Sequence, residues 1–242
     1  MDRRYALTVW QILGPVISLW ALFTYTALPW LLLAIVMFFL MRCIGGVITY
    51  HRILSHNTHS MHPIVEFLST GLALYGSFTS PVEYCAVHTN HHKFTDTDKD
   101  PHPHHLIGWR TLFPQLWINS GPQDGDVRTV VRLRRNPISM FYYKYYWYVL
   151  ALPLLLLFVS PELFLFGFVI PSTASVWSAS YSTFNHDESG PIDRGFWFGI
   201  LTGGEHKHVW HHNNPHSTAG EGWLNTVINL VATEQSKKKV NK

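Results

Sequence analysis

Histidine supplies the most prominent chemistry in this sequence. The pattern H-x-x-H-H occurs twice, at His88, His91, His92, His208, His211 and His212. Positions three and four apart lie on nearly the same face of a helix, so each box predicts a face of imidazoles. Neutral imidazole is a common ligand of divalent transition metals, and two such boxes in one chain predict a metal centre assembled from distant segments.

Three further histidines extend the set of candidate ligands. His51 and His56 precede the first box, and His186 stands alone between the two boxes. On an α-helix, residues five apart differ by about 140°, so this pair either serves different metals or lies where the helix ends. Nine histidines are too many for one tetrahedral zinc ion, and they predict two metals with positions left for oxygen. Affinity order does not choose the metal; ligand number and the redox chemistry expected at a membrane surface favour iron.

Several acids and one further histidine are candidates for orienting these ligands. Glu205 begins a Glu-x-x-His motif, but a soluble di-iron carboxylate site needs a second copy that the sequence lacks. Asp96 and Asp100 belong to a D-x-D-x-D run in which Pro101 replaces the glycine of a calcium loop. We therefore expect Asp96 and Asp100 to orient the histidines of the preceding box, and Glu205 to be a possible partner of a metal-binding histidine. The other seven histidines are expected to be surface or hydrogen-bonded groups: His59, His62, His102, His104, His105, His206 and His216. Of these, His102 is the first that we would add to the candidate site residues.

The composition is typical of a membrane protein. Charged residues make up 14% of the 242 residues, and aromatic residues make up 15%; soluble domains have about 25% charged residues. The net charge of +3 and the lack of a basic stripe argue against nucleic-acid binding. Only two cysteines are present, Cys43 and Cys85, and both are expected to be apolar fillers.

Apolar stretches predict an all-α integral membrane protein forming a single domain over residues 1–242. Four transmembrane helices are expected at about residues 6–24, 30–50, 145–160 and 163–185. Residues 51–140 and 186–242 then form a cytosolic helical cap that holds the two metals. Arg42 lies in the second span, where we expect its side chain to snorkel to the headgroups.

The stretch from Ile64 to Val82 is also apolar, but a single crossing would place His51 and His88 on opposite sides of the membrane. We interpret it as a buried or interfacial hairpin. Neither of the two short turns near Thr24 to Pro29 and Ser160 to Glu162 contains Lys or Arg. The positive-inside rule then predicts a multi-pass protein with both termini cytoplasmic, and all nine candidate ligands on that side.

These motifs resemble those of the membrane fatty acid desaturase family, especially its acyl-CoA and acyl-lipid branch. His51 to His56 resembles the family's H-R-x-x-S-H box, and His88 to His92 followed by Asp100-Pro101-His102 resembles its second box. Glu205 to His212 resembles the third, and His186 the isolated histidine after the last span. The likeness extends over roughly residues 45–215.

The resemblance implies four transmembrane helices under a cytosolic cap, two iron ions held by nine histidines, and oxygen-dependent removal of two vicinal hydrogens from a fatty acyl chain in the membrane. No side chain beyond the metal ligands need act as acid, base or nucleophile. Electrons are expected from a separate donor of ferredoxin or cytochrome type, since this sequence contains no rubredoxin-like cysteine pair, no H-P-G-G and no G-x-G-x-x-G.

Departures from the family pattern bear on the substrate. Ala86-Val87 replaces an Arg-Asp pair that contacts the CoA head group in the acyl-CoA enzymes, which favours an acyl-lipid or another carrier. Ser182 replaces an asparagine that touches one iron through water. A hydroxylase or ketolase of an alkane, carotenoid or sterol is the alternative on the same scaffold. A non-catalytic metal transporter or haem protein is the remote alternative, disfavoured because such proteins place ligands within their spans.

Overall fold

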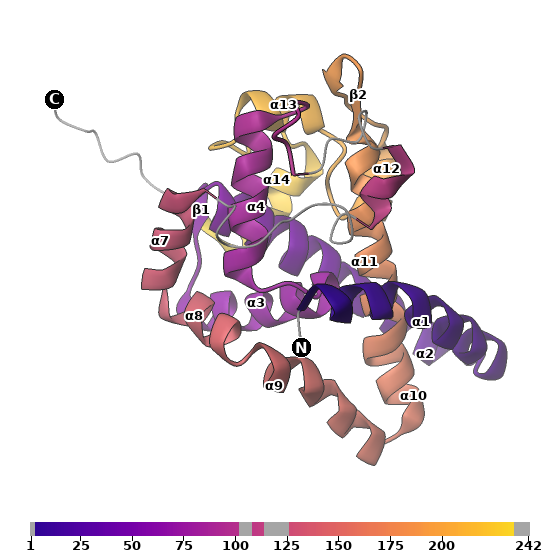
Figure 1. Cartoon of the computed structure of the whole chain (residues 1–242). Coiled ribbons are helices and arrows are strands. Elements are labelled where there is room, and N and C mark those ends of the chain that lie inside the picture. Colours follow the sequence, from indigo (N-terminus) through magenta and orange to yellow (C-terminus); the bar gives the residue numbers. More distant parts are fainter. Residues whose placement is uncertain (1–2, 102–107, 114–125, 235–242) are drawn as a thin grey trace, which may run out of the picture.

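Helices dominate the structure, a computed structural model that describes residues 3–101, 108–113 and 126–234 (Figure 1). Strands within these ranges form two antiparallel pairs of two residues each. They are β1 (His59–Ser60) with β4 (Thr233–Glu234), and β2 (His186–Asp187) with β3 (Gly190–Pro191). The described part of the chain is therefore mostly helical, in agreement with the predicted class.

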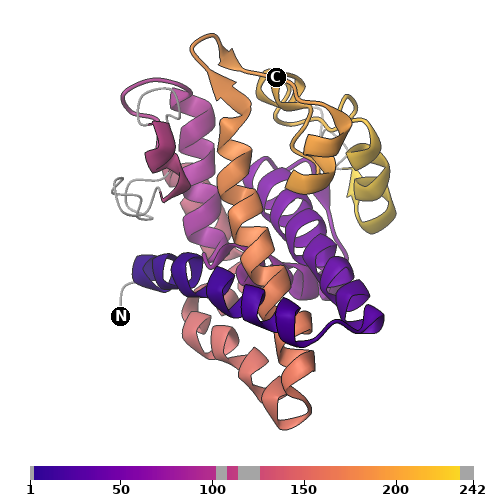
Figure 2. The same cartoon turned by 90° about the vertical axis from the view of Figure 1, so that its right-hand side faces the viewer.

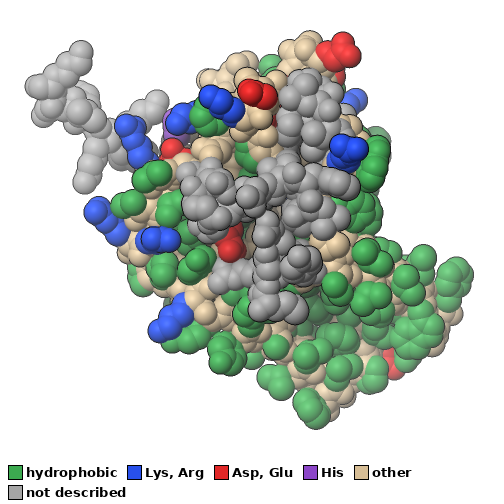
Figure 3. All heavy atoms as spheres, viewed as in Figure 1, with side chains coloured by type: hydrophobic (Ala, Val, Ile, Leu, Met, Phe, Trp, Pro, Cys, Tyr) green, Lys and Arg blue, Asp and Glu red, His purple; other side chains and the backbone are tan. Residues whose placement is uncertain are grey.

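Three helical segments are long and apolar enough to cross a membrane, namely Ala6–Thr24, Leu28–Ser55 and Pro161–Asn185. The first is α1 (Arg3–Thr24), and the second joins α2 (Leu28–Phe39) to the π-helix η1 (Leu40–Ser55). The third joins α10 (Pro161–Phe164), η4 (Leu165–Val169), α11 (Ile170–Ser182) and η5 (Thr183–Asn185). Hydrophobic side chains cover the region of α1, α2 and α10 in Figure 3, whereas Lys and Arg gather mostly at the left and upper parts.

A shorter apolar helix stands where the third span is expected. After α8 (Pro137–Lys144), the chain forms α9 (Tyr146–Ala151) and the 3-10 helix η3 (Leu152–Phe158), and the apolar segment Tyr146–Phe158 is shorter than the other three. Ser160 then caps α10, because its Oγ accepts a hydrogen bond from the Leu163 N–H at 3.0 Å. Four membrane crossings and a cytosolic cap stay predictions.

The second long helix differs from the prediction at both Arg42 and its end. Arg42 does not snorkel: it is 4% exposed, and its guanidinium donates to Ser178 Oγ at 3.1 Å and to Ser182 Oγ at 3.3 Å. Two hydroxyls of α11 thus replace the headgroups as acceptors. The helix also continues through Ser55 instead of ending near Tyr50, so His51 lies within it.

The apolar stretch from Ile64 to Val82 forms one helix and a turn. Helix α3 (Pro63–Ser77) ends at Phe78, which has a left-handed φ of 52°, and Ser80 and Glu83 form a capping box that starts α4 (Pro81–Phe94). The reversal lies at the end of the stretch, so the hairpin consists of α3 and α4 together. It returns the chain to the level of the histidines on η1.

Glycine lets α3 run close beside η1. A Cβ on Gly45 would lie 2.5 Å from the backbone nitrogen of Ala73, and one on Gly76 would lie 3.0 Å from the carbonyl oxygen of Met41. Because residue 45 meets residue 73 while residue 41 meets residue 76, the two helices are antiparallel.

The polar end of the molecule is built from shorter helices around α4 (Figures 1 and 2). They are η2 (Gly108–Leu112), α7 (Val127–Arg135), α12 (Phe196–Thr202), α13 (His208–Asn213) and α14 (Trp223–Val231). Leu224 and Ile228 of α14 are buried against Val47 and Ile48 of η1. Arg132 of α7 donates to the carbonyl oxygen of Ser55 at 3.2 Å. These contacts fix the elements that carry the histidines.

Candidate metal centre

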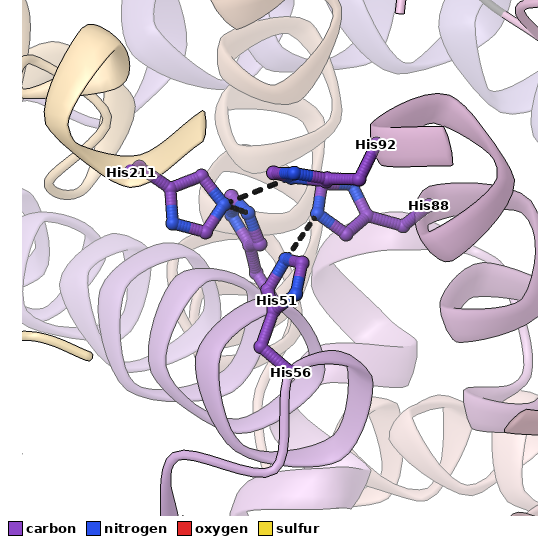
Figure 4. Close-up of side chains that lie close together, drawn as sticks. All are labelled: His51, His56, His88, His92 and His211. Atoms are coloured by element: carbon purple, nitrogen blue, oxygen red, sulfur yellow. Dashed lines mark hydrogen bonds between the residues drawn. The ribbon is translucent and has the colours of Figure 1, made fainter. Parts of the chain in front are cut away.

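The nine predicted histidines lie in two groups, and within each group the ligand atoms are all within 4.8 Å of one another. The five-histidine cluster contains His51, His56, His88, His92 and His211 (Figure 4). The four-histidine cluster contains His91, His186, His208 and His212. Each cluster therefore takes residues from parts of the chain more than 100 positions apart.

Both H-x-x-H-H boxes are divided between the clusters. On α4, His88 and His92 enter the five-histidine cluster, while His91 enters the other. On α13 the division is reversed, since His211 alone joins the five-histidine cluster. Positions i+3 and i+4 differ by about 100° around a helix, so one helical face can serve two neighbouring metals.

The pair His51 and His56 joins the same cluster because η1 is a π-helix. In a π-helix the backbone hydrogen bond links residues five apart, which brings side chains five apart onto one side. The α-helical angle of about 140° used in the sequence-based argument therefore does not apply. His56 occupies the position directly after η1, where the chain leaves the helix.

The Nε2 atoms converge in both clusters. In the first, the Nε2–Nε2 distances are 2.7 Å for His51–His211, 2.9 Å for His56–His88 and 3.0 Å for His92–His211. In the second, His208 Nε2 lies 2.8 Å from His186 Nε2 and 3.1 Å from His212 Nε2. Rings arranged with their nitrogens facing a common point are suited to share a metal ion rather than to bond one another.

Burial keeps the imidazoles neutral, which is the protonation state that binds metal. Removal from water lowers the pKa of His56, His88, His208 and His211 well below the ordinary value, and that of His92 to about 2. The neighbouring imidazoles act in the same direction.

Carboxylates hold the opposite ring nitrogen of several of these histidines. His91 Nδ1 lies 2.9 Å from both oxygens of Asp100, and His186 Nδ1 lies 2.9 Å from Asp96 Oδ2. Asp96 thus reaches the isolated histidine rather than the preceding box. A carboxylate on Nδ1 fixes the tautomer that leaves the Nε2 lone pair free for a metal.

Glu205 serves His51 in the same way, with Oε1 2.5 Å from His51 Nδ1. Gly203 and Gly204 precede it with positive φ angles of 71° and 123°, a turn that favours glycine. Asn185 Nδ2 donates to the Glu205 carbonyl oxygen at 2.5 Å, which ties this turn to η5.

Two buried residues near the centre were not expected from the sequence. Arg52 and Glu221 are both 0% exposed, and Arg52 Nε lies 2.8 Å from Glu221 Oε1. Arg52 also contacts His51, with Nη1 2.6 Å from both ring nitrogens. Arg52 belongs to the H-R-x-x-S-H box, and Glu221 stands between Gly220 and Gly222, but neither pattern shows that the two side chains meet.

Other candidates lie elsewhere. Ser182 Oγ donates to the Ala179 carbonyl oxygen and accepts from Arg42, so its bonds in the described structure do not involve a histidine. His102 falls in residues 102–107, outside the described ranges. His216, expected to be a surface or hydrogen-bonded group, donates from Nδ1 to the carbonyl oxygen of His56 at 2.7 Å.

The donor set fits two transition-metal ions. Neutral imidazoles suit iron, copper, nickel and zinc. Five converging nitrogens exceed the four ligands of a tetrahedral zinc site, and four can hold either a tetrahedral ion or an ion with further open positions. The residues present therefore fit the two ions inferred from the sequence.

No family model matches the sequence. It is similar to an sn-1 stearoyl-lipid 9-desaturase of Anabaena variabilis, with 26% identity over 75% of this chain and 69% of that protein. It is 25% identical to a "Probable acyl-CoA desaturase" of Schizosaccharomyces pombe over 83% of this chain, and 30% identical to a stearoyl-CoA desaturase of Bos taurus over 57%. The matches span 46% and 41% of these last two proteins, less than half of their length.

Proposed function

We propose that this chain, a homologue of the membrane fatty acid desaturases, is a di-iron desaturase that introduces a double bond into a fatty acyl chain. The observation that carries the proposal is the pair of histidine clusters at the ends of apolar helices. The homologues support the reaction class, and the clusters supply the chemistry it needs. The reaction removes two hydrogens from adjacent carbons, and with O2, two electrons and two protons it yields two waters.

When bound, the two iron ions would supply the activation of O2 and the one-electron steps. The protein's own contribution is to hold and orient. The nine imidazoles set the positions of the metals, and Asp96, Asp100 and Glu205 fix three ring orientations. Burial of most of these rings excludes water from the centre. The electrons come from an external donor of ferredoxin or cytochrome type.

The surroundings of α4 favour an acyl-lipid substrate over a CoA thioester. Ala86 is fully buried and packs in an apolar cluster with Leu54, Val82 and Val130, so no charged pair stands before the box to meet a CoA head group. Membranes containing the protein are therefore expected to desaturate acyl chains of added phospholipid more efficiently than acyl-CoA.

Gas chromatography of fatty acid esters from host cells expressing the wild type or His91→Ala tests the reaction. We expect new unsaturated acids in the wild type and none in the variant. Hydroxylated acids without new double bonds would instead assign the hydroxylase alternative. A profile equal to that of the empty host would reject both.

A further inference from the structure

A buried ion-pair network lies behind the five-histidine cluster. Arg52 is fully buried on η1, and its Nε and Nη2 meet the two Glu221 oxygens at 2.8 and 3.0 Å. Nη2 also lies 3.3 Å from Glu205 Oε2. One guanidinium therefore ties together two carboxylates that come from separate turns. Because a buried charge is costly without a partner, this contact strongly fixes the position of Glu221.

Among the described residues, Glu221 contacts a histidine of one cluster. Its Oε1 lies 3.4 Å from Nδ1 of His211, a member of the five-histidine cluster. Glu205 is less selective, since its Oε2 also lies 3.9 Å from Nδ1 of His208 in the four-histidine cluster. His211 Nδ1 is buried without an aligned hydrogen bond among the described residues, and Glu221 Oε1, which also pairs with Arg52 Nε, is the carboxylate oxygen that faces it. A buried ring nitrogen of this kind requires a partner, and Glu221 supplies one.

The local chain holds the Glu221 side chain inward. The Glu221 N–H donates to the Thr218 carbonyl oxygen at 3.0 Å, and Gly222 follows with a positive φ of 63°. Gly220 lies against the Trp210 ring: a Cβ added to Gly220 would be 2.2 Å from the nearest ring atom. The turn therefore has little freedom, and it places a carboxylate beside α13.

We propose that Glu221 is a positioning residue for the metal of the five-histidine cluster, acting on His211 and held in place by Arg52. It sets how tightly that metal is bound and leaves the other metal unaffected. The inference rests on the proposed metal centre. Removing a carboxylate that orients a metal-binding histidine weakens metal affinity by about 10- to 100-fold, which is the expected effect of Glu221→Gln.

The test uses the purified full chain with Co2+ as the probe, in two backgrounds that each retain one cluster. His208→Ala with His212→Ala leaves the five-histidine cluster, and His88→Ala with His92→Ala leaves the four-histidine cluster. In the first background Glu221→Gln should raise the Co2+ dissociation constant about 10- to 100-fold and change the Co2+ absorption spectrum. In the second background the constant and the spectrum should not change.

Glu221→Asp is the second variant, because it retains the charge that Arg52 needs for folding but withdraws the carboxylate from His211. It should weaken Co2+ binding in the first background only. Equal weakening in both backgrounds, or none in the first, would overturn the inference while the metal centre stands. A wild-type chain that binds no Co2+ would overturn the proposed function as well.

Discussion

At the scale of single residues, the arrangement depends on which nitrogen of each imidazole is engaged. Asp96, Asp100 and Glu205 occupy Nδ1 of His186, His91 and His51, and the Nε2 atoms are left to converge. The carboxylates come from turns rather than from the helices that carry the boxes. Ligand geometry is thus set by short segments with unusual backbone angles, such as Asp96 with a φ of 59°.

Asp96→Asn tests this role. Asparagine tolerates positive φ and keeps the shape of the side chain, so the loop should fold, but His186 loses its carboxylate. We expect metal binding to the four-histidine cluster to weaken about 10- to 100-fold, measured by Co2+ titration. Asp98→Asn is the matched control, since it removes the same charge from an exposed position in the same loop. An equal loss in the control would show a general effect of charge instead.

Spacing within the boxes, the pair before them and the position of His186 after the last apolar run selected the nine histidines that lie together in the two clusters. Asp100 and Glu205 were within reach of the same reasoning, as acids close to the boxes. Glu221 was not, because its contact with Arg52 joins residues 169 positions apart and depends on how the turn after α13 folds. The sequence also did not predict that each box is divided between two clusters. The H-x-x-H-H spacing shows that the three histidines share a helix face, but it does not show how many metal ions that face serves.

At the scale of elements, the centre depends on the close packing of η1 with α3. This contact allows the α3–α4 hairpin to bring His88 and His92 beside His51 and His56. The sequence predicted that the chain must turn back, because both pairs need one side of the membrane. It did not predict the π-helix, since hydrogen bonds between residues five apart leave no distinct pattern in an apolar segment.

Gly45→Ala should disturb this packing. The new methyl group would meet the backbone of Ala73 at 2.5 Å, and backbone cannot move aside as a flexible side chain can. Overpacking of this kind costs about 1–3 kcal/mol, so the unfolding midpoint of the metal-free protein in detergent should fall. Gly167→Ala is the control, because its methyl group would find ordinary contacts at 3.7 Å. A midpoint unchanged by Gly45→Ala would mean that the helices can separate without loss.

At the scale of the whole molecule, hydrophobic side chains gather over α1, α2 and α10 (Figure 3), and the histidine clusters form where the end of the apolar helix η1 meets α4 and α13. Three helices have the length of a membrane span, and the segment Tyr146–Phe158 is shorter. The sequence predicted the order of these elements from hydropathy. Helix ends were less predictable, because packing of α14 on η1 extends the buried helix beyond the apolar run.

The orientation of the chain can be tested by cysteine labelling in cells. Thr26 lies in the turn between α1 and α2, and Glu188 lies in the turn between β2 and β3; both are exposed. Cys43 and Cys85 are buried, so background labelling should be low. An impermeant maleimide should modify Thr26→Cys in intact cells and Glu188→Cys only after permeabilisation. Labelling of both from the same side would contradict the predicted topology.

The number and kind of metal ions bound to the purified protein is the most direct test of a di-iron centre. Elemental analysis with an absorption spectrum is expected to give two iron ions per chain and no haem band. It should give one iron when His51 and His211 are both changed to alanine, and one when His186 and His208 are. A single zinc ion, a haem spectrum or no bound metal in the wild type would contradict the di-iron centre.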